Sequence, residues 1–153
     1  MRAWLIAVAL ISACTHGAMA DDQSDVVAPI TAFHAALTAN DPAAATAQLG
    51  PSFFIADERT SAQTDRVRAH LYLSGERLTA WPARYLSEAG PHRSESTVVS
   101  VSVRADAAIV ITRDTGSNAF RTWRDEETIW VLGRVDGRWR IAGYIIRDFQ
   151  APE

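Results

Sequence analysis

Apolar residues recur at helical spacing in the first polar part of the chain. The stripe that they form consists of Val26, Ile30, Phe33 and Leu37. Spacings of four, three and four place these side chains on one face of a helix. Ser24 or Asp25 is a suitable cap at its start, and Asn40 can end it in a left-handed conformation. The pattern predicts an amphipathic first helix.

A second, alanine-rich helix is predicted directly after the first. Asp41 is a good cap residue, and Pro42 fits the first helical position because no amide hydrogen is needed there. Gly50-Pro51 should stop this helix after Leu49. The short connection predicts that the two helices form a helical hairpin.

The next segment mixes strand and helix signals. The apolar run at 53–55 predicts a first strand. Residues 64–74 have helical spacing and are expected to form a third helix that Gly75 ends. Residues 76–91 are ambiguous, because their apolar spacing is roughly helical but Pro82 would have to begin such a helix or break it.

From Thr97 onward the pattern is that of strands. Valines at every second position of 99–103 alternate with polar residues, as in a half-buried strand. A turn at Ala105-Asp106 leads to a further apolar run at 108–111. Helices first and strands afterwards predict an α+β domain with an antiparallel sheet, packed against about three N-terminal helices.

The last two strands are expected over residues 119–135 and 138–149. Asp136-Gly137 between them favours the positive φ angles of a tight hairpin turn. The runs 129–132 and 141–146 are apolar at every position, which is typical of strands that are buried on both faces. The helices can cover one face only. We therefore expect a homodimer; the alternatives are an ordinary apolar surface patch or a face that docks another protein.

The N-terminus carries the pattern of an export signal. Residues 3–13 form an unbroken apolar run after Arg2, too short to cross a membrane as a helix. Ala18-Met19-Ala20 is a small-x-small cleavage pattern. We expect residues 1–20 to be a secretory signal and residues 21–153 to be a single domain.

A second cleavage position is also compatible with the sequence. Ile11-Ser12-Ala13-Cys14 matches the bacterial lipoprotein box, in which Cys14 would carry the lipid. The protein is thus expected to be periplasmic or secreted, with a lipid on Cys14 as its one means of membrane attachment. Cleavage after Ala20 would leave a chain without cysteine, whose core must supply its stability.

Charge narrows the possible partners. The net charge of −3 argues against nucleic acid, which needs a clustered positive surface. Every basic residue is arginine, which fits either carboxylate or phosphate recognition or simply a GC-rich genome. No metal-ligand spacing, phosphate loop or nucleophile elbow occurs, so neither a metal nor a cofactor is predicted.

The order of elements and several local motifs resemble the nuclear transport factor 2-like superfamily, in its SnoaL-like branch. The matching stretches are Phe33-His34-Ala35-Ala36-Leu37 with Asn40-Asp41, Phe53-Phe54, His70-Leu71, Glu127-Thr128 before Trp130-Val131-Leu132, and Asp136-Gly137-Arg138-Trp139-Arg140-Ile141-Ala142. The resemblance implies a curved sheet wrapped around helices into a cone with a ligand pocket at its wide mouth. Such proteins include polyketide cyclases, ketosteroid isomerases, dehydratases, and proteins that only bind or oligomerise, so the fold leaves function open.

The chain departs from this resemblance at the last strand. Many secreted relatives carry two histidines there, at the positions of Gly143 and Ile145. Glycine and isoleucine neither bind metal nor transfer protons, so chemistry that depends on such a histidine pair is not expected.

Acid–base chemistry has a few candidate residues. His70, on the predicted third helix, could serve as a base or hydrogen-bond donor. Asp57 and Glu58 follow the first strand, where the resemblance implies a carboxylate at the pocket mouth. His34, beside the apolar stripe, is a candidate ligand-binding residue, whereas His92 after a Gly-Pro loop is expected to be exposed. For each of these the alternative is an ordinary structural or solvated side chain.

The mixed-charge run 121–127 is the other candidate. In a strand, Arg121, Trp123 and Glu127 share one face. If that face points into the cone, the indole could stack on a ligand while the charged residues bind its polar groups; otherwise they form surface ion pairs. The leading hypothesis is an exported protein that binds an apolar small molecule. The alternatives are a lyase or isomerase and a protein-interaction module.

Overall fold

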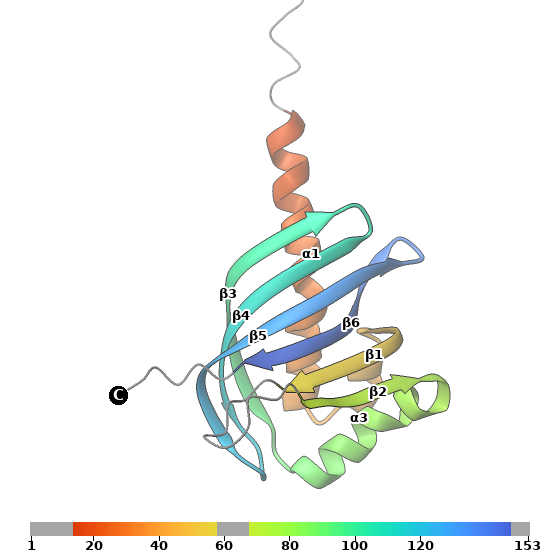
Figure 1. Cartoon of the computed structure of the whole chain (residues 1–153), viewed down its shortest axis with the longest axis vertical. Helices are drawn as coiled ribbons and strands as arrows, with labels where there is room; N and C mark the ends of the chain where they lie inside the picture. The colour runs from red at the N-terminus through yellow and green to blue at the C-terminus, as the bar shows by residue number, and fades with distance from the viewer. Residues whose placement is uncertain (1–13, 58–67, 148–153) are drawn as a thin grey trace, which may run out of the picture.

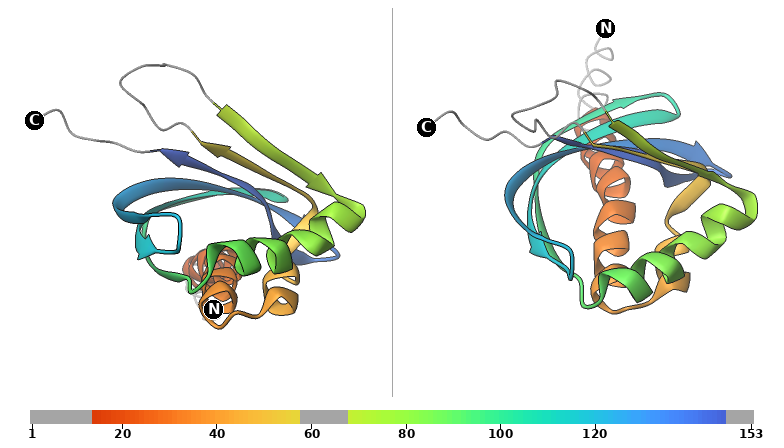
Figure 2. Two further views of the ribbon diagram at one scale, coloured as in Figure 1. Left: turned by 90° about the horizontal axis from the view of Figure 1, so that it is seen from below. Right: turned by 60° about the horizontal axis from the view of Figure 1, so that its bottom comes forward.

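The computed structural model describes residues 14–57 and 68–147, and their side chains except those of 14–22, 57, 68–70 and 125. The elements in chain order are α1 (Cys14–Thr38), α2 (Pro42–Thr46), β1 (Leu49–Asp57), β2 (Arg68–Ser74), α3 (Gly75–Ala89), β3 (Arg93–Arg104), β4 (Ala107–Ser117), β5 (Thr122–Val135) and β6 (Arg138–Arg147). The predicted α+β class is confirmed. Figures 1 and 2 show the sheet curving around α1, with α3 beside β1 and β2.

The strands form one sheet in the order β2-β1-β6-β5-β4-β3. Neighbouring strands are antiparallel except for β1 and β6, which run parallel. The prediction of a purely antiparallel sheet is therefore wrong at this one pair. β1 and β6 are far apart in the sequence but adjacent in the sheet, and their pairing joins the β1–β2 pair to the other strands.

The first helix is longer than predicted. It begins at Cys14, so Ser24 and Asp25 lie inside it and do not cap it. Residues 14–23 contain no proline, so helical hydrogen bonding continues upstream of the predicted start. This N-terminal part of α1 extends past the sheet (Figure 1). The predicted apolar stripe is buried, and Asn40 has the expected positive φ of 57°.

The second helix begins as predicted and ends early. The Asp41 side chain accepts a hydrogen bond from the backbone N–H of Ala44 at 2.9 Å, and Pro42 occupies the first turn. The helix stops at Thr46, and Gly50-Pro51 lie within β1 instead of ending the helix. Pairing of Leu49 with β6 draws this segment into the sheet.

The predicted helix over 64–74 is wrong where the structure describes it. Residues 68–74 form β2, whose Leu71 pairs with Ile55 of β1. Along β2 the side chain of Leu73 is buried and that of Tyr72 is exposed, which is the period-two pattern of a strand. Residues 64–67 lie outside the described residues.

Gly75 starts a helix and does not end one. Its φ of +54° lets the chain turn sharply from β2 into α3. The ambiguous segment is helical through Pro82, and it buries Leu78, Trp81 and Leu86 on one face. No helix in the described part of the chain is long and apolar enough to cross a membrane.

The long hairpins follow the prediction closely. Asp136 and Gly137 have φ values of 50° and 75°, as the predicted tight turn requires. In β3 the register shifts between Val98 and Ser100, so Val99 leaves the alternation expected of the valines and is half exposed.

The sheet has two different faces. Its concave face packs against the helices and includes the buried residues Val110, Trp130, Leu132 and Ile141. Its convex face, called here the outer face, carries Ile109, Ile129, Val131 and Ile145, which are only partly covered. Both faces are thus apolar, as predicted for the last two strands.

Candidate functional site

A cavity of about 490 Å³ lies between α1, α3 and the concave face of the sheet. Aromatic side chains make up much of its wall: Phe33, Trp81, Tyr85, Trp123, Trp130 and Tyr144. Several of these rings contact one another. The rings of Trp81 and Tyr85 stack with centroids 5.4 Å apart, and those of Trp130 and Tyr144 lie 4.9 Å apart. The described residues therefore form a cavity with largely aromatic walls.

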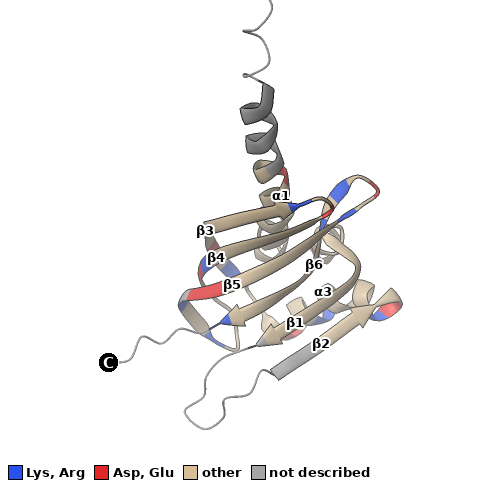
Figure 3. Cartoon of the chain, turned by 45° about the horizontal axis from the view of Figure 1, so that its top comes forward, with Lys and Arg blue, Asp and Glu red and all other residues tan. Residues whose placement is uncertain are grey.

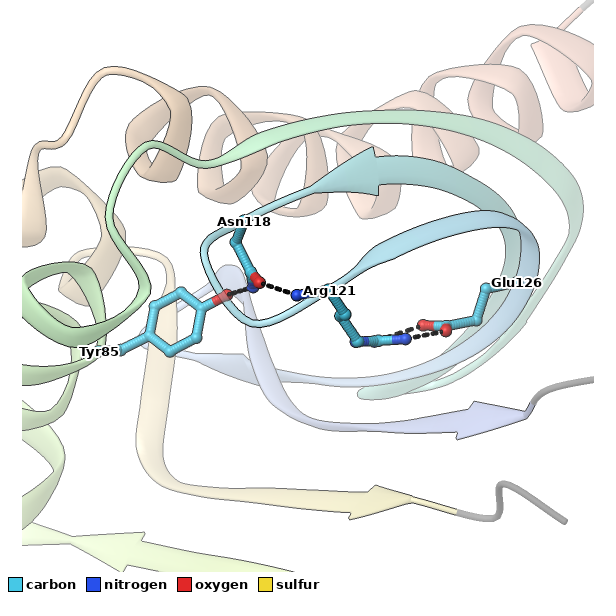
Figure 4. Close-up of polar contacts among 4 residues, drawn as sticks. All are labelled: Tyr85, Asn118, Arg121 and Glu126. Atoms are coloured by element: carbon cyan, nitrogen blue, oxygen red, sulfur yellow. Dashed lines mark hydrogen bonds and ion pairs between the residues drawn. The ribbon is translucent and has the colours of Figure 1, made fainter. Parts of the chain in front are cut away.

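Several residues of the cavity lining are joined by polar contacts, some of which are drawn in Figure 4. Asn118 Oδ1 accepts from the backbone N–H groups of Phe120 and Arg121, at 2.9 and 3.0 Å. This orients the amide so that Nδ2 donates to the Tyr85 hydroxyl at 3.1 Å. The hydroxyl oxygen lies 3.1 Å from His92 Nδ1. A hydroxyl oxygen has two acceptor sites and one hydrogen, so it either donates to Nδ1 or accepts from it, according to the tautomer of His92.

His92 is part of the cavity wall. Its side chain is buried at 7% exposure, so the expectation of an exposed His92 is wrong. Burial, and second the nearby His34, lower the pKa of His92 to about 4. No described group pairs with Nε2. A neutral imidazole, whose Nε2 is buried without a described hydrogen-bond partner, is thus part of the cavity wall.

An ion pair lies in the same wall. Both terminal nitrogens of Arg121 bind the Glu126 carboxylate, at 2.5 and 3.0 Å, and Glu126 is only 4% exposed. The guanidinium also lies 4.9 Å from the centre of the Trp123 ring. Arg121 and Trp123, which were named as candidate ligand-binding residues, are both part of the cavity lining.

The predicted shared face of Arg121 and Glu127 is wrong. Gly116 pairs with Trp123 while Asp114 pairs with Glu126, so β5 has one residue more than β4 between these pairs. This bulge reverses the alternation, and Glu126 turns inward. Glu127 instead lies 3.4 Å from Arg147, outside the cavity lining.

Asp114 is the second buried carboxylate of the site. It faces Glu126 across β4 and β5, lines the cavity and is 4% exposed. Its Oδ1 atom has no hydrogen-bond partner among the described residues. The sequence pattern could have indicated that Asp114 points inward, because it continues the alternation in β4 whose buried positions are Ala108, Val110 and Thr112.

His34, which was named as a candidate ligand-binding residue, lines the cavity. Its ring is held between two serine hydroxyls of β3, with Nδ1 2.6 Å from Ser94 Oγ and Nε2 3.2 Å from Ser96 Oγ. Burial lowers the pKa of His34, and the negative charge of Asp114 partly opposes this shift. Both ring nitrogens are therefore engaged by the protein.

The predicted acid–base residues have a different outcome. The backbone of His70 lies in β2 and not on a helix, and that of Asp57 ends β1. Their side chains and the whole of Glu58 lie outside the described residues. Their proposed chemistry stays a prediction, whereas the structure brings Asp114, His92, Tyr85 and Asn118 together, none of which the sequence patterns singled out as a site.

The position of Gly143 explains one departure from the resemblance. A Cβ atom there would lie 2.3 Å from the ring of Phe54, which packs over the glycine. A histidine at this position has no room. Within the described residues, no group of three or more His, Cys, Asp or Glu side chains is placed to hold a metal ion.

Comparison with known proteins gives one positive result. No protein-family model matches the chain, and no curated protein matches it. Solved structures do match: an NTF2-like protein with a cystatin-like fold from Novosphingobium aromaticivorans has a TM-score of 0.64 at 12% identity, over 94% of this chain and 92% of that one.

Two further structures are similar over most of their length. An NTF2-like protein of unknown function from Shewanella oneidensis has a TM-score of 0.61 at 16% identity, over 83% of this chain and 99% of that one. A ketosteroid isomerase-like protein from Erwinia carotovora atroseptica has a TM-score of 0.59 at 16% identity, over 86% and 98%. At such identities the matches establish the fold.

Proposed function

For a chain with the nuclear transport factor 2-like fold, we propose that the function is to bind a small molecule in the aromatic cavity, and that the protein does so outside the cytoplasm, where the predicted signal at residues 1–20 would send it. The observation that carries this proposal is the aromatic cavity of about 490 Å³, whose lining includes two residues with a buried polar atom that lacks a described partner, Asp114 (Oδ1) and His92 (Nε2). A buried polar atom without a partner costs about 1–3 kcal/mol. A bound molecule whose polar groups reach these two side chains would reduce this cost.

The cavity has the composition of a ligand site. Its walls are aromatic, its volume is in the usual range for small-molecule pockets, and its polar groups are few and held in place. Asn118 orients Tyr85, and the Tyr85 hydroxyl in turn contacts the His92 ring. A binding site made in this way loses little entropy when the ligand enters.

A matched pair of substitutions tests this proposal. Ile146 lines the cavity, and its neighbour Ile145 lies on the outer face. The neutral dye 1-aminoanthracene, whose emission rises in apolar surroundings, is titrated into the wild type, Ile146→Trp and Ile145→Trp. We expect saturable binding to the wild type, at least tenfold weaker binding to Ile146→Trp because the indole fills the cavity, and little change in Ile145→Trp. Equal binding to both variants, or none to the wild type, contradicts the proposal.

Asp114 favours a second candidate function, an isomerase that moves a proton on a β,γ-unsaturated ring ketone. The carboxylate would take a proton from the carbon between the carbonyl and the C=C bond. The C–H bonding pair would form a double bond to the carbonyl carbon while the carbonyl π pair moves to the oxygen, and His92, in the tautomer with hydrogen on Nε2, would donate to that oxygen. The protonated Asp114 then gives the proton to the γ carbon, and the C=O bond re-forms in conjugation with the shifted C=C bond. Proton NMR of 2-tetralone in D₂O tests this: Asp114→Asn should abolish protein-dependent C–H exchange. An equal exchange rate with and without wild-type protein rejects the isomerase.

We also propose that a second copy of the chain covers the outer face. Tyr72 and Ile109 are 65% and 47% exposed there, and the strands in Figure 3 carry most of their charges near turns and ends. Sedimentation velocity of the wild type and of Ile129→Glu checks this. We expect the wild type to be a dimer and Ile129→Glu to be a monomer, because the substitution would bury a charge in the interface. A monomeric wild type at tens of micromolar would favour a foreign partner or an ordinary apolar patch.

A further inference from the structure

The polar end of the cavity holds two carboxylates for one guanidinium. Asp114 and Glu126 are directly paired across neighbouring strands, and both are almost fully buried. Like charges in this position repel each other. Arg121 directs both of its terminal nitrogens to Glu126, so it neutralises only one of the two.

No other cation of the described cavity lining balances Asp114. The two histidines of the lining are neutral at pH 7, because burial lowers the pKa of His34 and of His92. On its other side Asp114 pairs with Ser96 of β3, which carries no charge. The described lining therefore has a net charge of about −1, located at Asp114.

The aromatic walls suit a positive charge. The face of an aromatic ring attracts a cation within about 6 Å of its centre, and cages of several rings bind quaternary ammonium groups. Rings from α1, α3 and the sheet surround this cavity. One such contact already exists in its wall, where the Arg121 guanidinium lies over Trp123.

We propose that the ligand of this cavity is an organic cation, whose positively charged nitrogen pairs with Asp114 while its apolar body lies among the aromatic rings. This inference rests on the proposed binding function and adds the charge of the ligand to it. An anionic ligand is disfavoured because Glu126 already occupies Arg121. A metal ion is a poorer occupant because the described residues supply no group of three ligands.

Three phenols that differ mainly in charge provide the test. Their para substituents are trimethylammonium, tert-butyl and sulfonate, so the first two have nearly the same shape. In calorimetric titrations of the wild type, we expect the cation to bind at least tenfold more tightly than the neutral phenol and the sulfonate to bind most weakly. Equal or tighter binding of the neutral phenol overturns the proposal, as does a cation that fails to bind at millimolar concentration.

Variants locate the preference and separate its failure from that of the proposed function. Asp114→Asn should remove the preference for the cation and leave binding of the neutral phenol within about twofold. Asp136→Asn, an equal charge change in an exposed turn whose positive φ asparagine tolerates, should keep the preference.

If Asp114→Asn does not fold, Glu126→Gln is the second variant: it frees Arg121 and should shift binding from the cation toward the sulfonate. The inference is also overturned if Asp114→Asn or Glu126→Gln keeps the wild-type preference for the cation. If the wild type does not bind 1-aminoanthracene, the cavity itself is rejected as a binding site.

Discussion

The concave face of the sheet and its outer face are built from the same kinds of residues. Along β5, Trp130 and Leu132 point to the helices while Ile129 and Val131 point away from them. The concave face differs in its polar end, where buried carboxylates, a guanidinium and histidines meet among aromatic rings. On the outer face a charged pair, Arg147 and Glu127, lies partly exposed at the end of the strands. We infer that apolar packing is common to both faces, whereas selective binding is a property of the concave face.

The largest expected effect comes from neighbouring residues that point to opposite faces. Leu132→Ala should lower the free energy of unfolding by about 3 kcal/mol, because it leaves a cavity in the core. Val131→Ala should cost only about 1 kcal/mol, because Val131 is half-buried. Urea denaturation at low protein concentration measures both values. Equal losses would mean that the outer face is packed as tightly as the core.

The two arginine–glutamate pairs offer a comparable contrast. Arg121→Gln leaves the buried Glu126 without its partner and should cost about 3 kcal/mol. Arg147→Gln removes a more exposed pair and should cost less than about 1 kcal/mol. Thermal unfolding of both variants checks this order. A reversed order would contradict the assignment of the inner pair as buried.

The concave face should also make stability depend on pH. The pKa of His92 is about 4 in the folded protein and about 6.5 when the chain is unfolded, so protonation favours unfolding. The stability that the neutral His92 ring contributes is complete above pH 6.5 and is lost as the pH falls toward 4. Urea titrations at pH 7, 5.5 and 4 measure the free energy of unfolding. Between pH 7 and pH 4 we expect this free energy to fall by about 3 kcal/mol less in His92→Asn than in the wild type. Parallel curves for the two proteins would show that His92 is not buried as a neutral ring.

A smaller effect is expected from a single buried hydrogen bond. The indole N–H of Trp130 donates to the Thr112 hydroxyl at 3.0 Å. Thr112→Val keeps the shape of the side chain and leaves this N–H without a partner, at a cost of about 1–2 kcal/mol. Thr115→Val is the matched control, because Thr115 is an exposed residue of the same strand. Equal stability of the two variants would indicate that the indole finds another acceptor.

The sequence allowed correct prediction of those elements that depend on local signals. The capping of α2 by Asp41, the left-handed Asn40 and the Asp136-Gly137 turn all require specific backbone conformations that their residues favour. The segment 68–74 was mistaken for a helix because its strand character comes from pairing with β1, which is a long-range contact. Similarly, the parallel pairing of β1 with β6 has no local signal.

The candidate site was predictable only in part. Arg121, Trp123 and His34 could be placed near a pocket, but the choice between Glu126 and Glu127 depended on a bulge that strict alternation cannot show. His92 follows a loop, and its burial results from contacts with Tyr85 and Trp123, which lie on other elements. The polar end of the cavity is therefore a product of tertiary structure.

The most direct test of the central claim is native mass spectrometry of the protein purified from its own host. The wild type and Ile146→Trp are compared under identical conditions, and the mass of any retained small molecule is determined after denaturation. The account predicts one bound molecule per chain in the wild type, carrying a positive charge of its own, and its loss from Ile146→Trp. An unliganded wild type, or the same molecule retained by both proteins, would contradict it.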